Sequence, residues 1–259
     1  MNSTKIYSVI NQKGGVGKTT TTINLGTAMA ACGAKVLLID LDPQGNLSTG
    51  LGIEKADRNN GTYDILINKS SATKLYKETA VPNLHVITAN ENLLGLDIEL
   101  ANSSDRATRL RESLLEELNY DFILLDCPPA LNILTINALV ASEGALVPLQ
   151  AEFYALEGLS QLIKTINKIR NTINSKLKLE GIILTMYDAR NNLSNQVEED
   201  VRSYLGRDVF QTIIPRNIRL SEAPSHGVPA LIYDYKCLGS QAYINLAREV
   251  LIKAGWEIN

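Results

Sequence analysis

The stretch NQKGGVGKTT at residues 11–20 combines glycines with lysine and threonine in an order that suits phosphate binding. Its glycines allow the backbone to turn tightly and to point its N–H groups at an anion. Gly17, Lys18 and Thr19 fit the second half of the pattern G-x-x-x-x-G-K-[ST], in which the lysine contacts phosphates and the hydroxyl contacts magnesium. A helix after the stretch would add its positive N-terminal end. The plainer alternative is a glycine-rich turn that only connects a strand to a helix.

The first half of the stretch departs from that pattern. Position 12, where the first glycine is expected, is Gln12, and the next residue is a second lysine, Lys13. The sequence therefore raises the question of what this additional cation contacts.

Carboxylates follow two other apolar segments. Asp126 ends the run in LLDCPP, where it could hold a water on Mg²⁺, or could only cap a turn. Asp40 and Asp42, in LIDLDPQGN, would share one face if the chain stays extended. Asp42 could orient or deprotonate a water that attacks a γ-phosphate, although an Asp-Pro turn is the simpler alternative. For Asp40, we expect support near the metal rather than catalysis.

The elements that must position these residues alternate between strands and helices. Apolar runs predict strands at 5–11, 35–40, 83–89, 120–129, 144–150, 180–187 and 209–215. Helical patterns cover 19–32, 106–118, 156–173 and 240–255. Continuous apolar strands between helices predict an α/β fold, with a mostly parallel twisted sheet flanked by helices on both faces. We expect one domain over residues 1–259, with 53–62 as its most exposed loop.

In such sheets, ligands bind at the C-terminal ends of the strands. The polar groups at 11–20, 40–46 and 126–132 all follow predicted strands. If those strands are neighbours, the three groups converge on one site.

Composition limits the remaining function classes. The 259 residues carry a net charge of −3, so binding to nucleic acid or anionic lipid would need a local basic patch. Three scattered cysteines form no metal-ligand spacing and suit a reducing compartment. The N-terminus lacks a signal-peptide pattern, and no apolar run approaches the ~20 residues that span a bilayer. We expect a cytoplasmic protein.

Together the motifs KGGVGKTT, DLDPQGN and DCPP resemble those of the deviant Walker-A ATPases, a group of P-loop NTPases. More narrowly, they resemble the ParA/Soj family that partitions chromosomes and plasmids. The similarity continues through TINAL, FYALEGLSQL, LTMYDARNNLS and IIPRNIRLSEAPSHG, and covers the chain from residue 5 to about 251.

This resemblance implies a role for the early lysine. In the family, a signature lysine reaches across a dimer to the partner's ATP, and the matching residue here is Lys13. A side chain at Gly14 would crowd the facing subunit, and Asp42 matches the hydrolysis residue. The implied catalytic residues are Lys13, Lys18 and Asp42, and the implied magnesium site comprises Thr19, Asp42 and Asp126. The implied ATP-binding residues are Lys13, Gly14, Gly15, Val16, Gly17, Lys18, Thr19, Thr20, Met186, Pro215, Arg216 and Asn217.

The resemblance also implies partners. These are a second copy of the chain on ATP binding, non-specific double-stranded DNA on the nucleoid, and a ParB-type protein that stimulates hydrolysis. Arg190, Arg219 and Lys236 match positions expected to contact DNA, and the alternative for the arginines is that they are solvated surface residues. Two neutral residues follow Lys236 where relatives are expected to be basic, which suggests weaker DNA affinity.

Three alternatives stay open. A membrane-cycling MinD-type ATPase shares the loop but ends in a basic amphipathic helix, whereas nothing basic follows Lys253 here. A nitrogenase iron-protein type would need cysteines that bridge a cluster, and Cys127 has no suitable second cysteine nearby. A nucleotide-gated scaffold would bind ATP but scarcely hydrolyse it, which Asp42 argues against.

Overall fold

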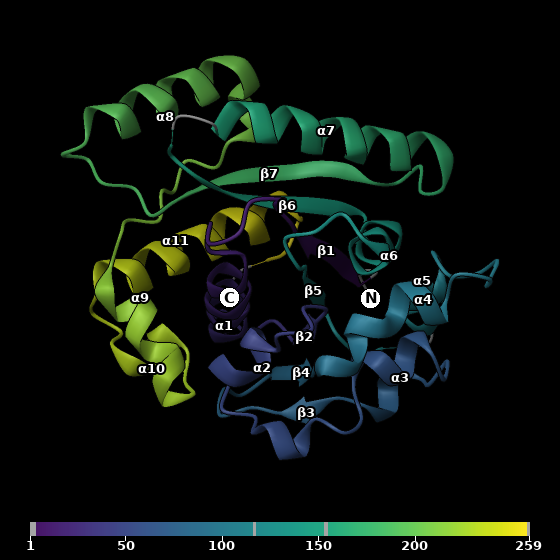
Figure 1. Cartoon of the computed structure of the whole chain (residues 1–259). Helices are drawn as coiled ribbons and strands as arrows, with labels where there is room; N and C mark the ends of the chain where they lie inside the picture. The colour runs from purple at the N-terminus through teal and green to yellow at the C-terminus, as the bar shows by residue number, and fades with distance from the viewer. Residues whose placement is uncertain (1–3, 116–117, 153–154, 258–259) are drawn as a thin grey trace.

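One seven-stranded sheet organises the computed structural model, which describes residues 4–115, 118–152 and 155–257 (Figure 1). The strand order is β3-β4-β2-β5-β1-β6-β7. Every neighbouring pair is parallel except β3 with β4, at one edge. The strands are β1 (Lys5–Val9), β2 (Val36–Asp40), β3 (Lys77–Glu78), β4 (Leu84–Ile87), β5 (Phe122–Asp126), β6 (Gly144–Gln150) and β7 (Lys178–Thr185). The predicted mostly parallel α/β sheet is confirmed.

Helices cover both faces of this sheet. The α-helices are α1 (Lys18–Ala31), α2 (Asn46–Gly50), α3 (Thr62–Leu66), α4 (Leu96–Glu99), α5 (Arg109–Ser113), α6 (Ile133–Ala141), α7 (Ala155–Thr172), α8 (Asn192–Leu205), α9 (Ile218–Glu222), α10 (Ala230–Tyr233) and α11 (Leu238–Lys253). Short 3₁₀ turns are η1 (Lys55–Asp57), η2 (Ala72–Lys74), η3 (Glu91–Gly95), η4 (Gly206–Asp208) and η5 (Ala223–His226).

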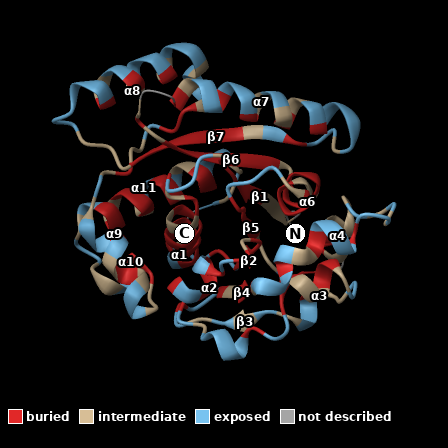
Figure 2. Cartoon of the chain, viewed as in Figure 1, coloured by how far each residue is buried: buried red, intermediate tan, exposed pale blue. Residues whose placement is uncertain are grey.

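The core lies in two layers, because successive side chains of a strand point to opposite faces. Leu38 of β2 packs in a cluster with residues of α1 and α11, whereas Leu37 packs in a second cluster with residues of α6 and α7. Figure 2 shows the buried strands in red and the solvent-facing sides of α7 and α8 in blue. Continuous apolar strands are therefore buried on both faces, as the sequence predicted.

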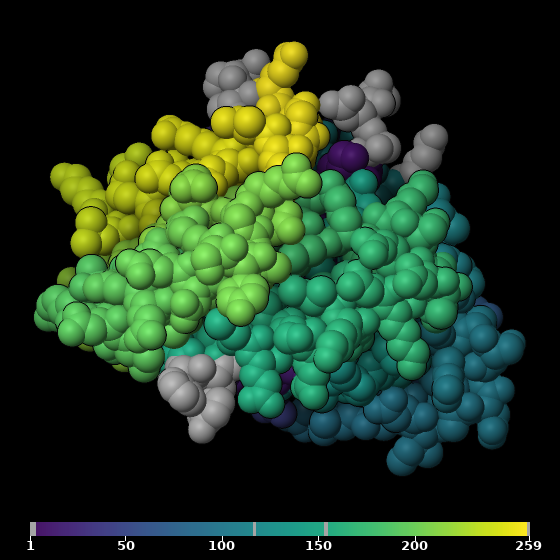
Figure 3. Space-filling view, turned by 90° about the horizontal axis from the view of Figure 1, so that it is seen from above, coloured from purple at the N-terminus to yellow at the C-terminus, as the bar shows by residue number. Residues whose placement is uncertain are grey.

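The C-terminal helix packs on the domain rather than standing free. Leu246, Val250 and Leu251 of α11 are buried, and the Trp256 ring lies 5.8 Å from the ring of Phe122. In the view of Figure 3, residues of α11 form one edge of the face made by α7 and α8. Across the described part of the chain, no helix is long and apolar enough to cross a bilayer.

The predicted strand at 209–215 is wrong. In place of a strand, two isolated bridges form. Val209 pairs with Ile182 of β7, and Pro215 pairs with Tyr187, two residues after β7 ends. Between them, the backbone N–H groups of Gln211 and Thr212 donate to the carboxylate of Glu249, at 2.8 and 2.7 Å. Those donors are therefore not available to a ladder, although the apolar residues around them still pack against the core.

Two other predicted elements need new boundaries, and the expectation for the loop at 53–62 holds only in part. The predicted helix at 106–118 is shorter, since α5 covers only 109–113, and residues 116–117 lie outside the described part. The loop at 53–62 is exposed at residues 54–57 and 59–60, as expected, but Arg58 within it is only 4% exposed. The strand predicted at 180–187 ends at Thr185, because Met186 has a left-handed backbone with φ 51°.

Candidate nucleotide site

Three loops meet at one edge of the sheet. They follow β1, β2 and β5, which are neighbours in the order β2-β5-β1, so the predicted convergence of residues 11–20, 40–46 and 126–132 is confirmed. A cavity of about 620 Å³ opens between them. Lys18, Thr19 and Asp42 line it together with the loop glycines.

The loop after β1 is held in a tight turn. Gly15 and Gly17 have φ of 75° and 88°, a left-handed region that favours glycine. The buried Asn11 side chain accepts the Lys13 N–H at 3.0 Å and donates to the Pro148 carbonyl at 2.8 Å, which ties the loop to β6. Helix α1 begins at Lys18, so its unpaired N–H groups face the loop, as an anion site requires.

The two lysines of the loop lie in different environments. Lys18 is buried, and its Nζ donates to the Lys13 carbonyl at 3.0 Å. Burial lowers the pKa of Lys18, and Asp126 opposes that shift. The Lys13 ammonium is half-exposed and forms an ion pair with Glu152. Lys18 therefore faces the cavity of its own chain, whereas Lys13 lies at the surface.

Asp126 accepts hydrogen bonds from two threonine hydroxyls at the start of α1. Its two carboxylate oxygens accept from Thr19 Oγ1 at 2.7 Å and from Thr22 Oγ1 at 3.1 Å. Burial, followed by the charge of Asp40, raises the pKa of Asp126 to about 8. A buried carboxylate in this state favours a nearby cation.

The Thr19–Asp126 pair fits magnesium by its chemistry. Mg²⁺ prefers oxygen ligands and usually keeps several waters, so it needs only one or two protein groups. The hydroxyl and the carboxylate would hold the ion directly or through water.

Asp40 and Asp42 lie in different environments. Asp40 is fully buried and accepts from Ser48 N at 2.9 Å and Ser48 Oγ at 2.7 Å, so it supports the loop. Asp42 lines the cavity, and its Oδ1 accepts the Gln44 N–H at 3.0 Å. The Asp-Pro turn is also present, because Gly45 N donates to the Asp42 carbonyl at 2.8 Å.

A second cavity, of about 160 Å³, adjoins the first and shares Gly17, Thr20 and Met186 with it. The predicted base-binding residues Met186, Pro215, Arg216 and Asn217 all line this cavity. Arg216 N donates to the Tyr187 carbonyl at 2.9 Å, which brings the two segments together.

Other lining residues were missed by sequence reasoning. Pro224, Val228 and Pro229 line the large cavity, and Tyr243 of α11 lines the small one. The sequence feature that could have located the first three residues is Asn24. Its side chain accepts the Ala230 N–H at 2.9 Å and so holds the segment 224–230 against α1. An isolated asparagine inside a helical pattern does not identify its distant partner.

Comparisons with known proteins agree with this geometry. A family model described as an AAA domain matches residues 4–179. The chain is 53% identical over 254 residues to the chromosome partitioning protein ParA of Caulobacter vibrioides, covering 96% of this chain and 95% of the relative. It is 51% identical to the sporulation initiation inhibitor protein Soj of Bacillus subtilis, covering 95% and 98%. The chain belongs to the ParA/Soj family.

This ParA/Soj chain also resembles solved structures of related enzymes. Cobyrinic acid a,c-diamide synthase from Mycobacterium smegmatis, solved with bound ADP and magnesium, matches with a TM-score of 0.84 and 32% identity over 98% of each chain. The two proteins share their fold over nearly the whole of both chains.

The basic residues proposed for DNA contact are mostly paired within the ParA/Soj chain. Arg190 forms an ion pair with Asp188 at 2.9 Å, and hydrogen bonds from Arg190 lower the pKa of Asp188 to about 2. Arg219 contacts Glu222 at 2.9 Å and Asp234 at 3.4 Å. Lys236 is exposed and lies two residues after Asp234 in the sequence. These pairings reduce the local positive charge that DNA would meet.

Cys127 does not suit an iron–sulfur cluster. It is fully buried, and burial raises the pKa of its thiol far above its ordinary value. Since cluster ligands are thiolates, this environment disfavours ligation.

Proposed function

We propose that this protein is a slow, partner-stimulated ATPase that partitions DNA. Two ATP-bound chains associate face to face, and the dimer binds DNA without sequence preference. A ParB-type partner stimulates hydrolysis, after which the dimer dissociates and releases the DNA. The names of the relatives, a chromosome partitioning ParA and Soj, support the biological role. A structural neighbour solved with ADP and magnesium supports the ligands.

One observation carries the proposal: the Thr19–Asp126 hydrogen bond at the mouth of a glycine loop. The hydroxyl, the buried carboxylate and the Lys18 ammonium surround the N-terminus of α1, where phosphates are favoured. Magnesium, when held by Thr19 and Asp126, would neutralise charge that develops on the β- and γ-phosphates.

Asp42 is the residue that we assign to hydrolysis. Its carboxylate lines the cavity that also contains Lys18 and Thr19, so it can orient a water beside the terminal phosphate. Asp40 and Gln44 fix its backbone and side chain through hydrogen bonds of 3.2 and 3.0 Å. The base occupies the small cavity beside Met186 and residues 215–217.

Lys13 supplies the dependence on a second chain. Its half-exposed ammonium lies outside the cavity of its own chain, where it can turn toward the nucleotide of a facing copy. Its pairing with Glu152 is weak enough to exchange, because half-exposed ion pairs contribute about 0–1 kcal/mol. A second cation on the phosphates then acts as an arginine finger does.

Dimerisation makes a weakly basic surface useful. Two linked patches bind DNA with greater avidity than one, without any new contact. Phosphate contacts make this binding strongly salt-dependent. ATP therefore acts as a switch between a DNA-bound dimer and a free monomer.

Phosphate release tests the assignment of Asp42. We expect Asp42→Ala to bind ATP normally and to lose DNA- and partner-stimulated phosphate release by about a hundredfold or more. The exposed loop acid Asp57 provides a control, since Asp57→Ala removes one carboxylate outside the cavity. Full turnover in Asp42→Ala would overturn the assignment.

A further inference from the structure

A buried arginine holds the segment that follows Asp42. Arg58 is 4% exposed, and its guanidinium donates to the Gly45 carbonyl at 3.0 Å and to Thr49 Oγ1 at 2.9 Å. Its Nε and Nη2 both donate to the Ile53 carbonyl, at 3.1 and 2.6 Å. All of these acceptors lie within residues 45–53, which run from the Asp42 turn through α2.

Burying this charge is costly, so the contacts must compensate. Burial lowers the pKa of Arg58, and the nearby Asp40 carboxylate opposes that shift. Arginine is rarely buried unless it is paired and hydrogen-bonded. Its planar fork can bind several acceptors in one fixed geometry, which a lysine cannot reproduce.

The guanidinium packs directly on the turn that contains Asp42. A Cβ on Gly45 would lie 2.5 Å from Arg58 Nη1, so the two groups are in close contact. Gly45 in turn donates its N–H to the Asp42 carbonyl at 2.8 Å. Any shift of Arg58 is therefore passed to the backbone of Asp42 through one residue.

Other contacts fix the same segment from different sides. Ser48 of α2 donates twice to the buried Asp40 carboxylate. Gly52 lies against the backbone of Gly227, where an added Cβ would be 2.8 Å from the Gly227 carbonyl oxygen. With Arg58 removed, the segment keeps these contacts but loses the four hydrogen bonds that the guanidinium donates.

We propose that Arg58 is a positioning residue for hydrolysis. It holds residues 45–53 so that Asp42 and Gln44 keep their places in the cavity wall. The inference rests on the proposed role of Asp42. Small displacements of a catalytic group can reduce rate by up to about a hundredfold, so loss of Arg58 should lower kcat.

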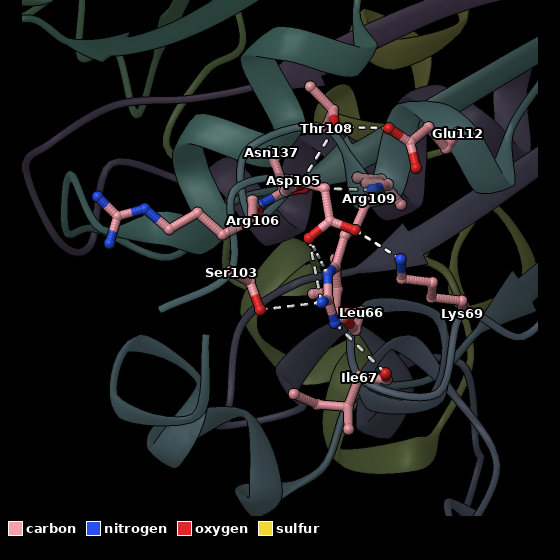
Figure 4. Close-up of polar contacts among 11 residues, drawn as sticks. Leu66, Ile67, Lys69, Ser103, Asp105, Arg106, Thr108, Arg109, Glu112 and Asn137 are labelled. Atoms are coloured by element: carbon pink, nitrogen blue, oxygen red, sulfur yellow. Dashed lines mark hydrogen bonds and ion pairs between the residues drawn. The ribbon is translucent and has the colours of Figure 1, made fainter. Parts of the chain in front are cut away.

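Arg109 provides a matched control elsewhere in the chain (Figure 4). Its side chain is 10% exposed, and it donates to the Leu66 carbonyl at 2.7 Å and to Ser103 Oγ at 3.1 Å. It also forms an ion pair with Asp105 at 3.1 Å. None of these partners lines the large cavity. Arg109→Met therefore removes a similar set of structural contacts without touching the Asp42 segment.

Kinetics of Arg58→Met, Arg58→Lys and Arg109→Met test the proposal. With saturating DNA and partner, we expect Arg58→Met to lose about tenfold in kcat with KM for ATP within about twofold. Arg58→Lys should recover part of that loss. Arg109→Met should lower the thermal midpoint but keep kcat below that midpoint. Wild-type kcat in Arg58→Met, or an equal loss of kcat in Arg109→Met, would overturn the proposal.

Amide hydrogen exchange separates this inference from the proposed function. We expect Arg58→Met to exchange faster at residues 42–50, and Arg109→Met to leave these amides unchanged. Unchanged exchange in Arg58→Met would refute the positioning role whatever the activity. If the wild-type protein shows no ATPase activity but Arg58→Met still exchanges faster at residues 42–50, Arg58 does hold this segment and the assigned reaction is refuted.

Discussion

Asp40 and Asp126 lie directly opposite each other on the neighbouring parallel strands β2 and β5, and both are fully buried. Each ends its strand, so the fold brings two carboxylates together below the nucleotide loop. Burial raises the pKa of Asp40 to about 6, and burial together with Asp40 raises that of Asp126 to about 8. When both carboxylates are ionised their negative charges repel each other, and a bound cation would offset this repulsion.

This pair predicts an unusual pH dependence of stability. Both native pKa values lie above the unfolded value of about 4, so the native state keeps protons that the unfolded chain has already released. Without nucleotide or magnesium, the free energy of unfolding should therefore fall as pH rises from about 5 to about 9. Urea titrations across this pH range, in the presence of a metal chelator, measure how the free energy of unfolding changes with pH. Asp40→Asn should flatten this dependence, and a rising free energy of unfolding in the wild type would contradict the account.

The two lysines of the loop should fail in different ways. Lys18→Ala removes the cation that faces the cavity of its own chain, so ATP binding itself should weaken. Lys13→Ala should leave ATP binding by the monomer within about twofold but lower stimulated turnover by at least about a hundredfold, as loss of an arginine finger does. Nucleotide titration and phosphate release measured on both variants separate the roles. Equal loss of ATP affinity in both would argue against a cross-dimer Lys13.

Gly14 should matter to a facing chain rather than to its own. Among the described residues, apart from its two chain neighbours, none has an atom within 4 Å of a Cβ built on Gly14, and the φ of Gly14 is not in the left-handed region. Gly14→Val should therefore keep the thermal midpoint within a few degrees but abolish ATP-dependent dimers. Gly158 has equally open surroundings, and Gly158→Val is the control. Light scattering in the presence of ATP measures the molar mass of each variant. ATP-dependent dimers of Gly14→Val would contradict the face-to-face arrangement.

Glu222 should restrain DNA binding through Arg219. Arg219 is paired with Glu222 at 2.9 Å and with Asp234 at 3.4 Å, so Glu222→Gln removes one of two opposing charges and should strengthen binding to duplex DNA by a few-fold. Arg219→Ala should weaken binding and reduce the salt slope by about one contact per chain. Glu198→Gln makes the same charge change on the Arg202 pair and serves as control. An identical gain from both variants would indicate a net-charge effect instead.

Most of the fold followed from the sequence, because buried parallel strands produce uninterrupted apolar runs. β2 and β6 were predicted within one residue. Apolar content alone misled at 209–215, where the Glu249 carboxylate, and not β7, accepts the N–H groups of Gln211 and Thr212. Such a contact joins residues far apart in the chain, so local pattern cannot reveal it.

The site was predictable for a different reason. Glycines, Lys18 and Thr19 lie within one short motif, so their chemistry is visible in the sequence. Arg58 was not predictable, since a polar stretch with a charged residue indicates solvent exposure. Its burial depends on carbonyl groups of Gly45 and Ile53, and backbone acceptors leave no mark in the sequence.

Binding to non-specific duplex DNA tests the central claim most directly. It should be measured with ATP, ADP and no nucleotide, all with magnesium, at two salt concentrations. We expect DNA binding with ATP but not with ADP or without nucleotide. Higher salt should weaken this binding, and Gly14→Val should abolish it. Equal binding in all three states, or capture of the ATP form by anionic lipid vesicles with no DNA binding in any state, would contradict it.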